Sequence, residues 1–215
     1  DVETARWCHA QAEERGLTFV DAPISGGTAG AEAGTLTFML GGRAADVERA
    51  REIVAPMAGN TIACGEAGAG IAAKLVNNMM LFIGVMAMSE GSQLAEQLGL
   101  DAKIFWEVAR VSSGDSWPLR TWYPVPGVLE NAAANNNFDA TFSVDLARKD
   151  CGLAVQAGDT TGVHLPAARL ALAQLDELIA DGLGAKDCTL VAKLASPDGT
   201  LRGYDGSDPD RKAAM

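Results

Sequence analysis

Lys74 and Asn78 are the residues whose types and spacing point most directly to chemistry. They lie four apart in GEAGAGIAAKLVNN, residues 65–78, a segment that predicts a helix beginning after a run of glycines. Residues four apart share one helix face, so an ammonium and a carboxamide would project together near the start of this helix. A catalytic role for Lys74 competes with that of a snorkelling surface lysine, and for Asn78 with a helix–helix hydrogen bond.

A second polar group precedes this helix in DAPISGG, residues 21–27. Gly26 and Gly27 lack side chains, so backbone N–H groups could approach a carboxylate, with the Ser25 hydroxyl as a further donor. The alternative is a simple tight turn, and we expect Asp21 to shape the loop rather than to perform chemistry. The two groups together predict a site for a small oxyanion, with a lysine as the proton donor.

Four ordered blocks resemble the β-hydroxyacid dehydrogenases over roughly residues 1–203: DAPISGGTAGAEAGTLTFMLGG, GAGIAAKLVNN, SSGDSWPLRTWYPVPGV and FSVDLARKDCGLA. The third block, with Trp-Pro and Pro-Val-Pro-Gly, resembles the 3-hydroxyisobutyrate dehydrogenases in particular. The resemblance implies an oxidoreductase of a small hydroxyacid that uses NAD, with NADP not excluded, and oxidises 3-hydroxyisobutyrate to methylmalonate semialdehyde in valine catabolism. Two alternatives stay open: a reductase of tartronate or succinate semialdehyde, and an inactive oligomerising fragment.

The same resemblance implies roles for individual residues. Lys74 would be catalytic and would take the hydroxyl proton. Similar enzymes often carry tyrosine where this chain has Trp122, so a phenol would be missing there. Trp117 and Trp122 could instead pack a long loop, without contacting a substrate. Lys149 could instead form a surface ion pair with Asp150. The implied substrate-binding residues are Ser25, Gly26, Gly27, Asn78, Trp117 and Trp122, and the implied cofactor-binding residues are Phe142 and Lys149.

The expected fold is α/β followed by all-α. Residues 1–68 would be the C-terminal part of a Rossmann-like NAD-binding domain, residues 69–203 a helical 6-phosphogluconate-dehydrogenase-like domain that includes a long linking helix, and residues 204–215 a flexible tail. Similar enzymes open with a strand, a G-x-G-x-x-G turn and a helix. This chain opens on a helix instead, so we expect the C-terminal two-thirds of a longer protein, inactive by itself.

GAGIAA, residues 68–73, fits G-x-G-x-x-A, but the helix after it runs for about thirty residues without a returning strand, so we reject it as the primary dinucleotide site.

Apolar periodicity, together with the glycines and prolines that interrupt helices and strands, predicts the remaining elements. We expect helices at 1–15, 46–54, 69–98, 101–111, 141–161, 166–181 and 186–195, strands at 17–21, 36–40 and 61–64, and loops at 25–34 and 112–140.

Composition excludes several classes of function. The net charge of −11 and isoelectric point of about 4.6 argue against nucleic acid as a partner. Four scattered cysteines and two histidines, His9 and His164, without C-x-x-C argue against a metal site, and we assign the histidines no role. The apolar run 79–88 is too short to span a membrane.

The helix expected at 69–98 is apolar on more than one face, so we expect a homo-oligomer, a dimer or a tetramer. Reduced cysteines favour the cytoplasm of a bacterium, or the mitochondrial matrix if the source is eukaryotic.

Overall fold

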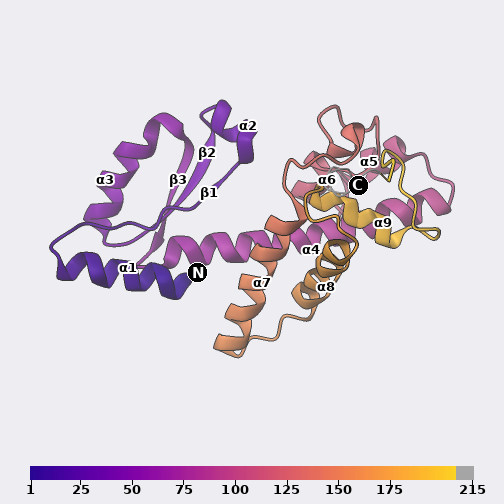
Figure 1. Cartoon of the computed structure of the whole chain (residues 1–215). Coiled ribbons are helices and arrows are strands. Elements are labelled where there is room, and N and C mark those ends of the chain that lie inside the picture. Colours follow the sequence, from indigo (N-terminus) through magenta and orange to yellow (C-terminus); the bar gives the residue numbers. More distant parts are fainter. Residues whose placement is uncertain (207–215) are drawn as a thin grey trace, which may run out of the picture. The chain divides into compact units, whose positions relative to one another are not determined.

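The computed structural model describes residues 1–206 of the chain (Figure 1). The chain divides into two compact units, residues 1–78 and the residues from 79 onward, and the boundary falls inside the long helix α4 (Ala69–Gln97). The first unit combines helices with a small sheet, and the second is built from helices. The expected fold class, α/β followed by all-α, is confirmed.

The first unit holds a three-stranded sheet in the order β1-β2-β3. β1 pairs antiparallel with β2, and β2 pairs parallel with β3. A parallel pair needs a crossover connection, which α3 supplies between β2 and β3. The elements are α1 (Val2–Glu14), β1 (Ile24–Ser25), α2 (Gly27–Glu32), β2 (Leu36–Gly41), α3 (Ala44–Val54), the 3₁₀ turn η1 (Ala55–Met57) and β3 (Ala58–Gly65).

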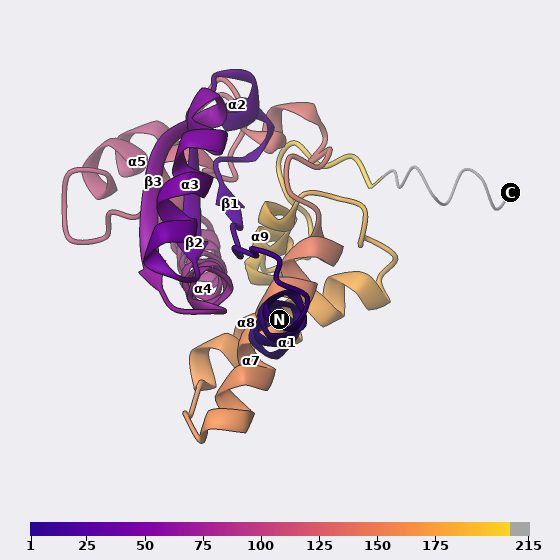
Figure 2. The ribbon, with the colours of Figure 1, turned by 90° about the vertical axis from the view of Figure 1, so that its left-hand side faces the viewer.

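Side-chain periodicity explains how α3 and β2 form the core of this unit. Leu36, Phe38 and Leu40 alternate along β2 and so face one side of the sheet. Val47 and Val54 lie seven apart on α3, two helical turns, and all five side chains form one buried cluster. Figure 2 shows α3 in front of β2 and β3, the strands that it contacts.

The second unit is helical. Its main core joins α4 to the helices that follow, with Phe82, Tyr123, Val144 and Leu175 all fully buried. The α7 and α8 helices pack against each other. The elements after α4 are α5 (Ala102–Ala109), α6 (Trp117–Thr121), the 3₁₀ turn η2 (Ala133–Asn136), α7 (Val144–Thr161), α8 (Pro166–Ala180), the 3₁₀ turn η3 (Cys188–Val191) and α9 (Ala192–Ala195).

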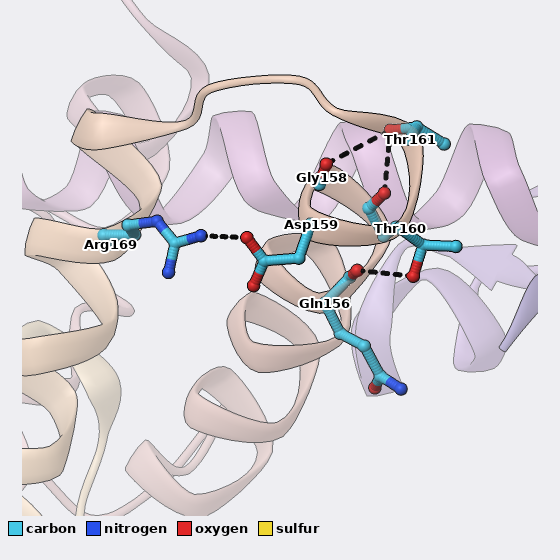
Figure 3. A network of polar contacts seen from close by, with 7 residues as sticks. Gln156, Gly158, Asp159, Thr160, Thr161 and Arg169 are labelled. Atoms are coloured by element: carbon cyan, nitrogen blue, oxygen red, sulfur yellow. Dashed lines mark hydrogen bonds and ion pairs between the residues drawn. The ribbon is translucent and has the colours of Figure 1, made fainter.

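The end of the α7–α8 pair is fastened by exposed polar contacts (Figure 3). Arg169 of α8 points to Asp159 of α7 and forms an ion pair with it. The Thr160 hydroxyl donates to the carbonyl oxygen of Gln156 at 3.0 Å, and the Thr161 hydroxyl to that of Ala157 at 2.8 Å. The two hydroxyls thus donate hydrogen bonds to backbone carbonyl oxygens in the last turns of α7. The Arg169–Asp159 ion pair is exposed, so it adds little stability.

Several expected elements differ from those observed. Residues 17–20 form no strand, and Asp21 makes a single bridge to Gly41, because the pairing with β2 begins there. The expected loop at 25–34 contains α2, and the expected loop at 112–140 contains α6 and η2. The helix expected at 186–195 is η3 followed by the short α9. The expected tail at 204–215 lies mostly outside the described residues.

Helix α4 is more apolar than its uninterrupted apolar run indicated. Its most apolar 18-residue window has a mean hydropathy of 1.6, enough by length and composition alone to cross a membrane, and 28% of that window is buried. One such helix is weak evidence for a membrane, because core helices of soluble proteins meet the same measure. Its residues instead contribute to two packed units, so packing accounts for part of its apolar surface.

Candidate functional site

Lys74 and Asn78 lie on successive turns of α4, within the first unit. Asn78 is buried, with 2% of its surface exposed, and its Oδ1 accepts a hydrogen bond of 3.1 Å from Nδ2 of Asn77. Lys74 is partly buried. Because α4 is continuous through both residues, the ammonium and the carboxamide project from the same helix face, as their spacing predicts.

The first turn of α4 is held by a carboxylate 47 residues upstream. Asp21 Oδ1 accepts a hydrogen bond from the backbone nitrogen of Gly68 at 2.8 Å, and Oδ2 accepts one from that of Ile71 at 2.9 Å. Asp21 is 5% exposed. Buried amide donors at a helix start need acceptors, and a negative charge there is favoured by the helix dipole. Asp21 therefore caps α4 from a distant segment.

His9 provides the third contact to this carboxylate. Its Nε2 lies 2.8 Å from Oδ1 of Asp21, and its ring meets Phe19 edge to face at 4.9 Å. His9, which was assigned no role from sequence, therefore has a carboxylate partner. The contact joins α1 to the segment that starts at Asp21, and local sequence carries no sign of a contact across twelve residues.

The glycines around the start of α4 serve close packing. A Cβ atom on Gly70 would stand 2.3 Å from the carbonyl oxygen of Met39 in β2, and one on Gly41 would stand 2.6 Å from the nitrogen of Gly70. Such distances are possible only without side chains. The G-x-G-x-x-A turn at Gly68 is thus pressed against the sheet, with two of its amides bound to Asp21. This geometry does not fit a dinucleotide pyrophosphate and supports the rejection of that turn.

The loop that precedes α2 is shaped by glycine. Gly26 and Gly27 have φ angles of 133° and 63°, a region that side chains rarely permit. A Cβ on Gly26 would also meet a Leu36 methyl group at 3.0 Å. Ser25 is fixed just before them, because it pairs with Thr37 of β2. Gly26 and Gly27 are both exposed residues, so a ligand can approach the loop.

In the second unit, three predicted site residues form one aromatic group. Trp117 meets Trp122 edge to face with ring centroids 5.0 Å apart, and Trp122 lies 6.1 Å from Phe142. Phe142 also contacts Phe82 of α4 at 5.6 Å. Trp117 is 48% exposed, so it forms the outer end of the group. The tertiary structure thus brings together residues from α6 and from the segment before α7.

Phe142 is anchored by a residue that sequence reasoning missed. The backbone nitrogen of Phe142 donates to Oδ2 of Asp187 at 3.1 Å, and Asp187 is 1% exposed. The neighbouring Lys186 is also buried, and its Nζ donates to the carbonyl oxygen of Asn137 and to Asp139, each at 3.0 Å. The only local signal was the adjacent Lys-Asp pair, which a surface helix would equally contain.

Lys149 lies on α7 with 61% of its side chain exposed, and its Nζ is 3.1 Å from a carboxylate oxygen of Asp150. The surface ion pair considered from sequence is therefore present, and a cofactor contact for Lys149 stays a prediction.

In residues 1–206 no group of three or more His, Cys, Asp or Glu side chains could hold a metal ion. Burial raises the pKa of the Cys151 thiol to about 11.

Two families of known proteins match successive parts of the chain. Residues 68–195 match the family described as the NAD-binding part of NADP-dependent 3-hydroxyisobutyrate dehydrogenase, and residues 1–65 match the NAD-binding domain of 6-phosphogluconate dehydrogenase. The chain belongs to the β-hydroxyacid dehydrogenase family. The family uses NAD or NADP, so the cofactor of this protein is one of the two.

Individual relatives differ in their substrates. An NAD-dependent L-serine dehydrogenase of Pseudomonas aeruginosa is 43% identical over 194 residues, which are 90% of this chain and 65% of that protein. A probable 3-hydroxyisobutyrate dehydrogenase of Mycobacterium tuberculosis is 47% identical over 165 residues, 77% of this chain and 56% of that protein.

A solved structure, M. tuberculosis 3-hydroxyisobutyrate dehydrogenase with L-serine, matches with a TM-score of 0.85 and 42% identity, covering 90% of this chain and 66% of that one. The chain thus spans less than two-thirds of the length of these relatives.

Proposed function

We propose that the whole protein is an NAD-dependent dehydrogenase that oxidises the primary hydroxyl of 3-hydroxyisobutyrate to give methylmalonate semialdehyde, a step of valine catabolism. The observation that carries the proposal is the placement of Lys74 and Asn78 on one face of α4, in a chain that belongs to the β-hydroxyacid dehydrogenases. Among the family's reactions, this one agrees with the Pro-Val-Pro-Gly segment at residues 124–127 and with the mycobacterial relatives.

The roles of the residues follow from their chemistry. Lys74, as the neutral amine, takes the hydroxyl proton and becomes the ammonium, and Asn78 holds the hydroxyl oxygen through its carboxamide. The backbone N–H groups of Gly26 and Gly27, with the Ser25 hydroxyl, bind the substrate carboxylate. The nicotinamide supplies the hydride acceptor. Trp117 and Trp122 are proposed as further substrate contacts, and Phe142 and Lys149 as contacts to the cofactor.

L-Serine is the second candidate substrate, favoured by the 43% identity to an L-serine dehydrogenase and by the matched structure with L-serine. The two substrates share a hydroxymethyl group and a carboxylate and differ in one substituent, methyl or ammonium. Removing an ammonium from water is costly unless a partner is present, although aromatic faces attract cations. The two proposed substrate contacts Trp117 and Trp122 are aromatic and uncharged, so we expect the methyl substituent to be favoured.

A substrate panel tests this assignment. The whole protein is assayed with 3-hydroxyisobutyrate and L-serine in the oxidising direction and with tartronate and succinate semialdehydes in the reducing direction, each with NAD(H) and NADP(H). We expect the highest kcat/KM for 3-hydroxyisobutyrate with NAD. A higher value for L-serine would assign the second candidate, and turnover limited to the semialdehydes would contradict both.

We further propose that the 215-residue chain alone binds NAD weakly and does not turn over. The observation behind this is that its one G-x-G-x-x-A turn is occupied by Asp21 and packed on β2. Titration of the isolated chain with NAD, followed by tryptophan fluorescence, measures the affinity. Robust dehydrogenase activity of the isolated chain would contradict this part of the proposal.

The partner we propose is a second copy of the chain. Helix α4 exposes Met80 and Leu94 by 65% and 62%, although its composition is that of a buried helix. Large apolar side chains gathered on one helix favour a covering surface. Sedimentation at micromolar concentration should show a dimer or a higher oligomer, and a stable monomer would count against the proposal.

A further inference from the structure

Asp21 connects the two parts of the proposed site that lie in the first unit. Its backbone begins the pairing with β2, through Gly41, and this pairing continues to Ser25 opposite Thr37. Its side chain holds the first turn of α4, the helix that carries Lys74. One residue therefore fixes both the strand that leads to the Ser25-Gly26-Gly27 loop and the helix that bears the lysine.

We propose that Asp21 is a positioning residue for Lys74, an inference that rests on the proposed function of Lys74. Ile71, whose amide is bound by Asp21, lies three residues before Lys74, which is less than one helical turn. A fixed Ile71 amide therefore sets the rotation and the height of the turn that presents the ammonium. A misplacement of about 1 Å can cost about 10²-fold in rate, so this hold has kinetic consequences.

The carboxylate is suited to this task in a way that a carboxamide is not. Both of its oxygens are in use, Oδ1 by Gly68 and His9 and Oδ2 by Ile71. In Asp21→Asn one of the two oxygens becomes an NH₂ group, which would face a backbone N–H donor. The variant keeps the size of the side chain but loses at least one bond to α4, together with the negative charge at the helix start.

Kinetics of the whole protein provide the first test. We expect Asp21→Asn to lower kcat by about 10- to 10²-fold while the KM for the dinucleotide changes by less than about twofold, because the hydroxyl proton transfer is disturbed and cofactor binding is not. Asp46→Asn is the matched control, since it removes the same charge in the same unit from a carboxylate that pairs with the exposed Arg43 and, within residues 1–206, makes no hydrogen bond to α4. An unchanged kcat in Asp21→Asn, or an equal loss in both variants, overturns the proposal.

Asp21→Glu separates positioning from stability. Glutamate keeps the charge and both acceptor oxygens but moves them by one methylene group, so we expect α4 to remain capped and displaced. The expected result is a folded protein whose kcat is at least about tenfold lower. Wild-type kcat in this variant would show that the placement of α4 does not matter for turnover, and would overturn the proposal even if Asp21→Asn failed to fold.

Amide hydrogen exchange in the 215-residue chain tests the hold on α4 without any turnover. In Asp21→Asn the amides of Gly68 and Ile71 should exchange at least about tenfold faster, while that of Ala72, which donates to the carbonyl oxygen of Gly68, should change less. Unchanged exchange at Gly68 and Ile71 overturns the proposal. If the whole protein oxidises no hydroxyacid, the proposed function fails, and the exchange measurement still decides whether Asp21 fixes the helix.

Discussion

The Oδ2 atom of Asp187 lies 3.1 Å from the backbone nitrogen of Phe142, 45 residues earlier in the chain. The same oxygen accepts hydrogen bonds from the nitrogen and the hydroxyl of Thr141, and Oδ1 accepts two more from Thr189. One buried carboxylate thus joins the segment before α7 to the start of η3. The predicted cofactor contact, Phe142, owes its position to this side chain.

Asp187→Ala should destabilise the second unit by about 3 kcal/mol or more, because it leaves several buried donors without an acceptor. The matched control is Asp198→Ala. Asp198 accepts the same pair of bonds from the nitrogen and hydroxyl of Thr200, but at an exposed position. Urea unfolding of the two variants measures the difference, and equal midpoints would show that the buried network of Asp187 adds nothing.

Lys74→Ala in the whole protein should lower kcat by about 10² to 10⁴-fold and leave dinucleotide binding nearly unchanged, because a positioned proton acceptor is lost. A small amine such as propylamine should restore part of the turnover. Lys103→Ala, which removes an exposed lysine from α5, is the control and should behave as wild type. Wild-type kcat in Lys74→Ala would refute the catalytic role.

Gly70→Ala should destabilise the first unit by about 1–3 kcal/mol or more, since the new methyl group would overlap the Met39 carbonyl oxygen and push α4 away from the sheet. Gly91 lies on the same helix, with no atom within 4 Å of an added Cβ. Gly91→Ala should therefore be neutral or stabilise by up to about 1 kcal/mol. Thermal unfolding compares the pair, and a tolerant Gly70→Ala would contradict the close helix–sheet contact.

Burial raises the pKa of Tyr123 from 10.0 to about 12, and the carboxylate of Glu96 adds to the effect. The unfolded chain therefore loses the phenol proton at a lower pH than the folded chain does. The stability contributed by the protonated phenol is complete below pH 10 and is lost as the pH rises through 12, by up to about 2–3 kcal/mol.

Tyr123→Phe should remove this alkaline loss. Its cost at neutral pH should be small, because the Tyr123 hydroxyl is buried without a hydrogen-bond partner within residues 1–206. Urea unfolding at neutral and alkaline pH, with Tyr204→Phe as the control, measures both effects. A variant that loses as much stability as wild type above pH 10 would contradict the assignment.

Local patterns were sufficient for much of the fold. Apolar spacing predicted the helix at 69–98, which is observed as α4, and the Asp101 side chain caps α5 at the start of the helix expected at 101–111. The spacing of Lys74 and Asn78 fixed their common face as soon as the helix was known. These features depend on interactions within a few residues, so the sequence by itself determines them.

Only the tertiary structure revealed the contacts that hold these elements in place. Asp21 meets Gly68 and Ile71 across 47 and 50 residues, and Asp187 meets Phe142 across 45. The hydrogen-bond partners of a buried carboxylate are the backbone amides that lie next to it in the folded chain. Local sequence propensities do not predict these partners, because they are far away in the sequence. The sequence determined which residues could do chemistry, and the long-range packing decided which buried groups position them.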